Sequence, residues 1–160
     1  MAGVDYFLKI DGIPGESTDS KHKDEIVLTS FSMGVSNAGT SASGGGGGEG
    51  KASFHDFNFT HQFDKASPLL MLACATGKHI PRATMTARKT ARGGFEFLFI
   101  KMNDVLVTSV QTAASGHDLP AESVSLAFAK IEVDYKPQKT NGSLGASISF
   151  LWDLKANRAG

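Results

Sequence analysis

The segment that comes nearest to a catalytic motif is a glycine-rich stretch ending in a lysine, Gly45 to Ala52. Up to Lys51 its spacing matches a loop that wraps nucleotide phosphates with backbone N–H groups and a lysine. Two requirements of such a site fail: Ala52 stands where a hydroxyl would hold magnesium, and alternating strand sequence follows instead of a helix N-terminus. The sequence therefore argues against a nucleotide-using enzyme. That hypothesis would be revived if the chain bound ATP and the substitution Lys51→Ala abolished the binding.

The five histidines do not have the spacing of a metal site. His55 and His61 are predicted to share one face of an extended segment, which separates them by roughly 20 Å, too far to share one ion. The single cysteine, Cys74, lies among apolar residues, as a buried structural cysteine does. No Gly-x-Ser-x-Gly elbow or pair of carboxylates suggests hydrolysis. We therefore predict no enzyme activity, no catalytic residue, no cofactor and no metal.

Composition excludes further classes of function. Lys+Arg and Asp+Glu are both 16, so the formal charge is zero and the chain lacks the cationic surface that binds nucleic acid or anionic lipid. A neutral surface does not oppose association between copies. The N-terminus lacks a basic and then apolar signal peptide, and the apolar run Leu69–Ala75 is too short to cross a bilayer. We expect synthesis in the cytoplasm, no membrane insertion and, for export, a dedicated route.

The elements that must position any site are mostly strands, because apolar and polar residues alternate along most of the chain. The expected strands cover 4–10, 27–36, the phenylalanine-rich segment 56–64, 82–88, 95–110, 122–135 and 146–154. In 122–135 the apolar set moves from even to odd positions near Ala129, which a bulge or burial on both faces would explain. These elements predict one domain, 1–160, that is mainly all-β: an antiparallel β-barrel or two-sheet sandwich.

One short helix should flank the strands, over residues 68–76. Its signals are Ser67 as the N-cap, Pro68 at the first helical position and Gly77 after the last.

The strand over 27–36 has an unusual polar face. Its odd positions are bulky and mostly apolar, whereas Ser30, Ser32, Gly34 and Ser36 are small and uncharged. A glycine-rich loop follows over 39–50, and glycine permits close approach of another backbone there.

Four stretches together resemble the haemolysin-coregulated protein (Hcp) family, the tube subunit of bacterial type VI secretion. They are Phe7–Ser17, Gly44–Lys51 leading into Phe57–Thr60, Asp64–His79 and Val133–Gln138. The resemblance implies hexameric rings that stack into a hollow tube similar to a phage tail tube, and small effectors carried or chaperoned in the lumen. It implies partners in the sheath, baseplate and spike proteins, and secretion from the bacterial cytoplasm by the type VI machinery.

The resemblance also suggests site residues. The candidates for contact with lumen and effector are Ser30, Ser32 and Ser36, with an ordinary solvent-facing strand as the alternative. The candidates for ring stacking or contact between subunits are Gly44, Gly45, Gly46, Gly47, Gly48 and Glu49, with a surface loop as the alternative. A monomeric barrel that binds a small apolar ligand remains the alternative function.

Overall fold

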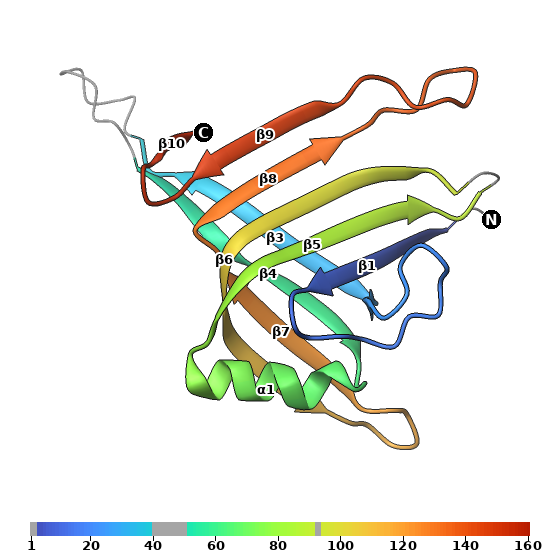
Figure 1. Ribbon diagram of the computed structural model, residues 1–160, viewed down its shortest axis with the longest axis vertical. Coiled ribbons are helices and arrows are strands. Elements are labelled where there is room, and N and C mark those ends of the chain that lie inside the picture. Colours follow the sequence, from blue (N-terminus) through green and yellow to red (C-terminus); the bar gives the residue numbers. More distant parts are fainter. Residues whose placement is uncertain (1–2, 40–50, 92–93) are drawn as a thin grey trace.

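The computed structural model describes residues 3–39, 51–91 and 94–160 (Figure 1). These residues form ten strands and one helix, so the prediction of a mainly β fold with one short helix is confirmed. In chain order the elements are β1 (Val4–Ile10), β2 (Ile26–Leu28), β3 (Ser30–Asn37), β4 (Ala52–Gln62), α1 (Ala66–Thr76), β5 (His79–Lys89), β6 (Glu96–Ala113), β7 (Ala121–Ala127), β8 (Lys130–Tyr135), β9 (Ile148–Asp153) and β10 (Arg158–Ala159).

The strands make two antiparallel sheets that share β6. The outer sheet, as we call it, has the order β2-β1-β5-β6-β8-β9-β10, and the polar sheet has the order β3-β4-β7-β6. Residues 98–103 of β6 pair with β8, and residues 106–113 pair with β7. The polar sheet lies behind the outer sheet in Figure 1, so the long strand β6 joins the two layers at one side.

The second connection between the sheets is the corner at Thr29. β2 pairs with β1 in the outer sheet, whereas β3, which begins one residue later, pairs with β4 in the polar sheet. The Thr29 N–H donates to the Thr60 carbonyl at 2.9 Å, which fixes this corner.

The shift of the apolar set near Ala129 has a simpler cause than a bulge. The segment 122–135 is two strands, β7 and β8, which pair with different parts of β6. Phe128 between them is buried, and the Ala129 N–H donates to the Asn103 carbonyl at 3.0 Å. The chain changes sheet here, so the side of the strand that faces the core changes as well.

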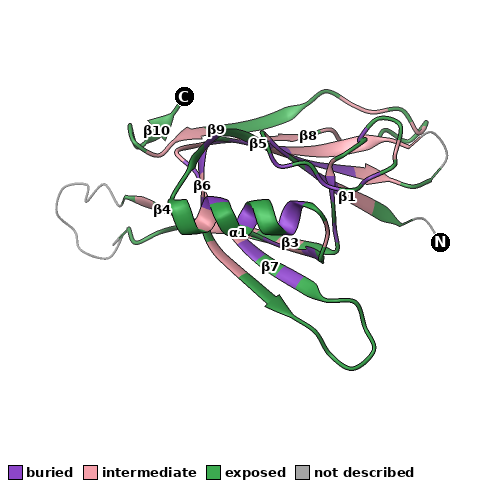
Figure 2. Ribbon diagram, turned by 60° about the horizontal axis from the view of Figure 1, so that its bottom comes forward, coloured by how far each residue is buried: buried purple, intermediate pink, exposed green. Residues whose placement is uncertain are grey.

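The core fills the space between the sheets. Its largest side chains, each less than 2% exposed, include Leu8, Ile26, Phe57, Phe59, Met85, Ile100, Met102, Leu126 and Ile131. Figure 2 shows buried positions along strands of both sheets and at intervals along α1. The opposite side of the polar sheet therefore remains free for another role.

Helix α1 begins two residues earlier than predicted, at Ala66, and Gly77 ends it with a positive φ of 64°, as expected. The prediction of Ser67 as N-cap was wrong, because Ser67 is buried inside the first turn. Asp64 supplies the acceptor instead: its Oδ1 accepts from the Ala66 N–H at 2.9 Å. Ser67 Oγ accepts from the Asp64 N–H at 3.1 Å, so the two residues together fix the start of the helix.

Candidate functional site: the polar face of a sheet

The three serines predicted to line a lumen are all exposed on the side of the polar sheet that faces away from the core. Ser30 and Ser32 border a shallow hollow of about 350 Å³ on this face. The other polar residues that line it are Asn58, Thr60, Ser109, Gln111, Ser123 and Ser125. Ser36 lies further along the same strand, paired with Ser53.

The register of four strands brings these residues together. Ser32 lies opposite Asn58, Asn58 lies opposite Ser125, and Ser125 lies opposite Ser109. Successive side chains of a strand point to opposite sides of a sheet. The same pairing therefore places the aromatic and aliphatic neighbours of these residues in the core.

Hydrogen bonds between side chains hold the polar face in place. Thr60 Oγ1 lies 2.6 Å from the Ser30 hydroxyl and 2.6 Å from the Thr29 hydroxyl. The Ser125 hydroxyl donates to Asn58 Oδ1. Short hydroxyl and amide groups that bond to one another give a wettable surface whose side chains do not project far.

The hollow is also uncharged, since none of the residues that line it is acidic or basic. The nearest carboxylate along β4, Asp56, accepts from Thr108 Oγ1 at 2.6 Å. Such a face offers hydrogen bonds but no strong electrostatic attraction to a passing molecule.

A bulge in β4 overturns the prediction that His55 and His61 share a face. The register passes from Ser32 opposite Asn58 to Gly34 opposite His55, so β4 holds one extra residue between the two pairs. His55 is therefore exposed beside Gly34, whereas His61 is buried and its Nε2 lies 2.8 Å from Glu122 Oε1. Sequence alternation alone cannot reveal a bulge, because it assumes an uninterrupted period of two.

Both edges of the polar sheet are unpaired in the described part of the chain. β3 forms ladder hydrogen bonds with β4 alone. At the other side, β6 beyond Leu106 pairs with β7 alone, since its pairing with β5 ends at that residue. An unpaired edge is a template for another strand.

The predicted stacking residues Gly44, Gly45, Gly46, Gly47, Gly48 and Glu49 lie outside the described residues. The sequence analysis also missed much of the site. Asn58, Thr60, Ser123 and Ser125 each occupy a polar position in an alternating segment, which was a usable signal. What the sequence lacked was the strand register that unites them with Ser32.

Within the described ranges, no helix has the length and apolar character needed to span a bilayer.

Comparison with known proteins assigns the family. Residues 7–135 match the family model described as type VI secretion system effector, Hcp. The protein hcp1 of Pseudomonas aeruginosa is 43% identical over 157 residues, which is 96% of this chain and 97% of that protein. Hcp1 from Salmonella typhimurium has a TM-score of 0.84 and 38% identity, with all of both chains covered. A solved type six secretion system protein has a TM-score of 0.91 and 33% identity, covering 99% of this chain and 100% of its own. The chain therefore belongs to the Hcp family of type VI secretion proteins.

Proposed function

We propose that this chain is a structural, non-enzymatic subunit that closes into hexameric rings, which stack into the hollow tube of a type VI secretion system. Small effector proteins travel in the lumen, and the tube meets sheath, baseplate and spike proteins before the machinery exports it. The number six and these partners rest on family membership. The observation that carries the proposal is an uncharged, small-residue face on a sheet whose two edge strands have no further strand partner among the residues that the structure describes.

The polar face has the chemistry that a transport channel needs. Ser32 and its neighbours present hydroxyl and amide groups, and water easily replaces any hydrogen bond that a cargo protein forms with them. A cargo protein can therefore touch this wall without being held there by charge. A face of exposed apolar side chains would instead bind a partially folded cargo tightly through burial.

The unpaired edges suggest how a ring closes. The strands of the polar sheet alternate in direction, so β3 of one copy can lie antiparallel to residues 107–113 of β6 in the next. When two copies join in this way, one copy keeps a free β3 edge and the other keeps a free β6 edge. The contact is therefore head-to-tail and can repeat until a ring closes. The polar face would then continue around the inside of the ring.

Apolar side chains near β3 and β9 support the same arrangement. Val35 is 56% exposed although it occupies a position on the core side of β3, and Ile148 on β9 is 68% exposed. Phe150, which packs on Phe54, is 40% exposed. A neighbouring copy on this side of the molecule would remove these surfaces from water.

The direct test is the size and shape of the purified protein. Light scattering after size exclusion should give a mass about six times that of the chain, and negative-stain images should show rings. A strictly monomeric protein at high concentration contradicts the proposal.

The lumen assignment has its own test. Ser32→Trp should leave rings intact and reduce the small effectors that co-purify with them, because the indole fills the channel wall. Ser115→Trp is the matched control, since Ser115 is exposed in the loop before β7. Loss of the ring in Ser32→Trp alone would place Ser32 at an interface between copies and not in the lumen.

The alternative of a monomeric ligand-binding barrel finds little support. The space that a ligand would need is occupied by Phe57, Phe59 and Met85, each of which is almost fully buried.

A further inference from the structure

A second hollow lies away from the polar face, at one end of the outer sheet. It has a volume of about 730 Å³ and is bounded by the end of β1, by β5 and by the loop over residues 11–25. Its basic residues are Lys9, Lys21, Lys23 and Arg82. Ile10 and Ile13, both buried, and Pro14 give it an apolar floor.

The carboxylates around this hollow are already engaged. Asp11 Oδ2 lies 3.6 Å from Arg82 Nε, and Asp24 Oδ1 lies 3.8 Å from Lys65 Nζ. Glu25 Oε2 lies 2.9 Å from His22 Nδ1.

The three lysines, in contrast, have no ion-pair partner within the described residues. Lys9 extends from the strand, and Lys21 and Lys23 extend from the loop, all of them exposed. Four basic and three acidic side chains line the hollow, so it carries a small excess of positive charge beside an apolar floor, on a chain whose formal net charge is zero.

Backbone contacts hold the loop in its shape before any ligand arrives. The Gly15 N–H donates to the Asp24 carbonyl at 2.8 Å, and the Asp24 N–H donates to the Ser17 carbonyl at 2.9 Å. The two arms of the loop cross so closely that a Cβ on Gly15 would lie 2.5 Å from the Glu25 carbonyl oxygen.

Side chains fasten the same loop to the sheets. Arg88 on β5 donates to both carboxylate oxygens of Asp19, at 3.0 and 2.8 Å. A ligand would bind to a surface that is already ordered, which lowers the entropy lost on association.

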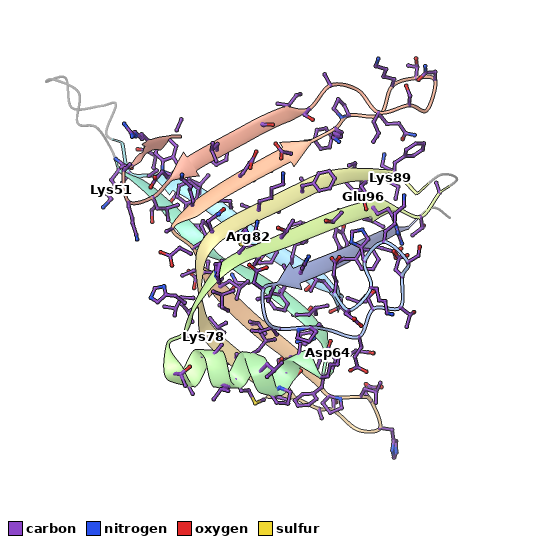
Figure 3. The ribbon with its side chains drawn as sticks, in the orientation of Figure 1. Lys51, Asp64, Lys78, Arg82, Lys89 and Glu96 are labelled. Atoms are coloured by element: carbon purple, nitrogen blue, oxygen red, sulfur yellow. The ribbon has the colours of Figure 1, made fainter. Side chains whose placement is uncertain are left out.

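The hollow lies on the outer sheet and not on the polar face. Arg82 lies on the outer sheet, which is the nearer layer in Figure 3, while β3, β4 and β7 lie behind it. This step rests on the proposed function: if the polar face lines the lumen, the outer sheet faces the surroundings of the tube.

We propose that this hollow docks a carboxylate-rich polypeptide segment from a protein that contacts the outside of the assembled tube. The three lysines supply the attraction, and the apolar floor supplies a place for an aliphatic side chain of the segment. A volume of about 730 Å³ is far larger than a phosphate ion needs and lies in the range of clefts that bury larger ligands.

The test uses the full chain and a labelled peptide rich in glutamate and leucine, followed by fluorescence anisotropy at low salt. The wild type should bind it, and added salt should weaken binding because the charges are exposed. The combined variant Lys9→Gln, Lys21→Gln and Lys23→Gln should bind at least about tenfold more weakly. The control Lys78→Gln changes an exposed lysine outside the hollow and should bind as the wild type does.

Several outcomes overturn the proposal. A glutamine and leucine peptide that binds equally well would show that charge is irrelevant, and equal loss in Lys78→Gln would show attraction without a site. Displacement of the peptide by inorganic phosphate at equal concentration would make the hollow a small-anion site.

Light scattering on the same samples separates the two proposals: rings that do not bind the peptide contradict only the docking site, and a monomer that binds it contradicts only the ring.

Discussion

The two histidines that are buried in this chain both contact carboxylates, but they do so in opposite surroundings. His61 on β4 lies 2.8 Å from Glu122 on β7, and neither side chain is exposed at all. His61 Nδ1 has no hydrogen-bond partner in the described residues, and Asp64 Oδ1 lies 3.7 Å from it. This pair joins two core strands directly behind the polar face.

His22 instead fastens the loop over residues 11–25 at the edge of the outer sheet. Its Nδ1 lies 2.9 Å from Glu25 Oε2 and its Nε2 lies 2.6 Å from Glu96 Oε1, so both ring nitrogens are bonded. The imidazole stacks on the Phe7 ring with 4.4 Å between the two ring centroids. The Arg88 guanidinium also lies over the Phe7 ring, 5.0 Å from its centroid.

The difference lies in what surrounds each pair. A fully buried pair adds little net stability, but losing one partner strands the other away from water. A pair near the surface is one of several moderate contacts, and water can replace part of each. Breaking the His61 pair should therefore affect the whole fold, and breaking the His22 contacts should affect mainly one loop.

The largest effect is expected for Glu122→Ala or His61→Ala. Each leaves a polar group without its partner in the core and should lower the free energy of unfolding by about 3–5 kcal/mol. Urea unfolding of the purified protein measures the loss. The double variant His61→Ala, Glu122→Ala should lose much less than the two single losses added together, because neither member of the pair is left stranded. Strictly additive losses would show that the two side chains do not depend on each other.

The pair also shows what sequence could not predict. Alternation gave the strands, their two faces and the exposed serines, because each of these depends on neighbouring residues. The partner of His61 is 61 residues away and depends on the register between β4 and β7. From the pattern of polar and apolar positions alone, His61 would be an ordinary polar residue, whereas in the structure it is buried on the same side of β4 as Phe57 and Phe59.

Local competition explains the remaining differences. Ser67 is a residue type that favours the N-cap position. Asp64, two residues before Ala66, accepts a hydrogen bond from the Ala66 N–H and so takes the capping role that was predicted for Ser67. The break between β7 and β8 comes from the way β6 joins two sheets, and the bulge in β4 lies in its pairing with β3; each depends on strand register, which no single segment encodes.

The next effect in size is expected for His22→Ala, at about 1.5–3 kcal/mol, since two hydrogen bonds to carboxylates and one ring stack are lost. Hydrogen exchange should become faster in residues 15–25 while the strands of the polar sheet keep their protection. His22→Phe is the control that preserves stacking on Phe7 and removes only the hydrogen bonds. Uniform loss of protection across both sheets would contradict the comparison, because His22 would then support the fold as His61 does.

A smaller, pH-dependent effect is expected for Asp19→Asn. Hydrogen bonds from Arg88 hold the pKa of Asp19 down to about 2, from an ordinary value of 3.8. The folded state therefore binds fewer protons than the unfolded state between these values. The contribution of Asp19 is complete above 3.8 and is lost as the pH falls toward 2. Urea midpoints measured from about pH 5 down to about pH 2 should fall less steeply in Asp19→Asn than in the wild type. Asp118→Asn, an exposed loop variant, should keep the wild-type slope.

The smallest effect, with the opposite sign, is expected for Asp64→Asn beside the core pair. Burial raises the pKa of Asp64 above 3.8, and the neighbouring His61 offsets part of that rise. The folded state then binds more protons than the unfolded state, so stability falls as the pH rises from 3.8 through the raised pKa. Asparagine keeps an acceptor for the Ala66 N–H but cannot ionise, so the variant should gain on the wild type as the pH rises through that window. The same urea titration used for Asp19→Asn measures this. If both variants lost stability relative to the wild type with increasing pH, the core carboxylate would be stabilised by its charge as the surface one is, and the contrast between the two regions would fail.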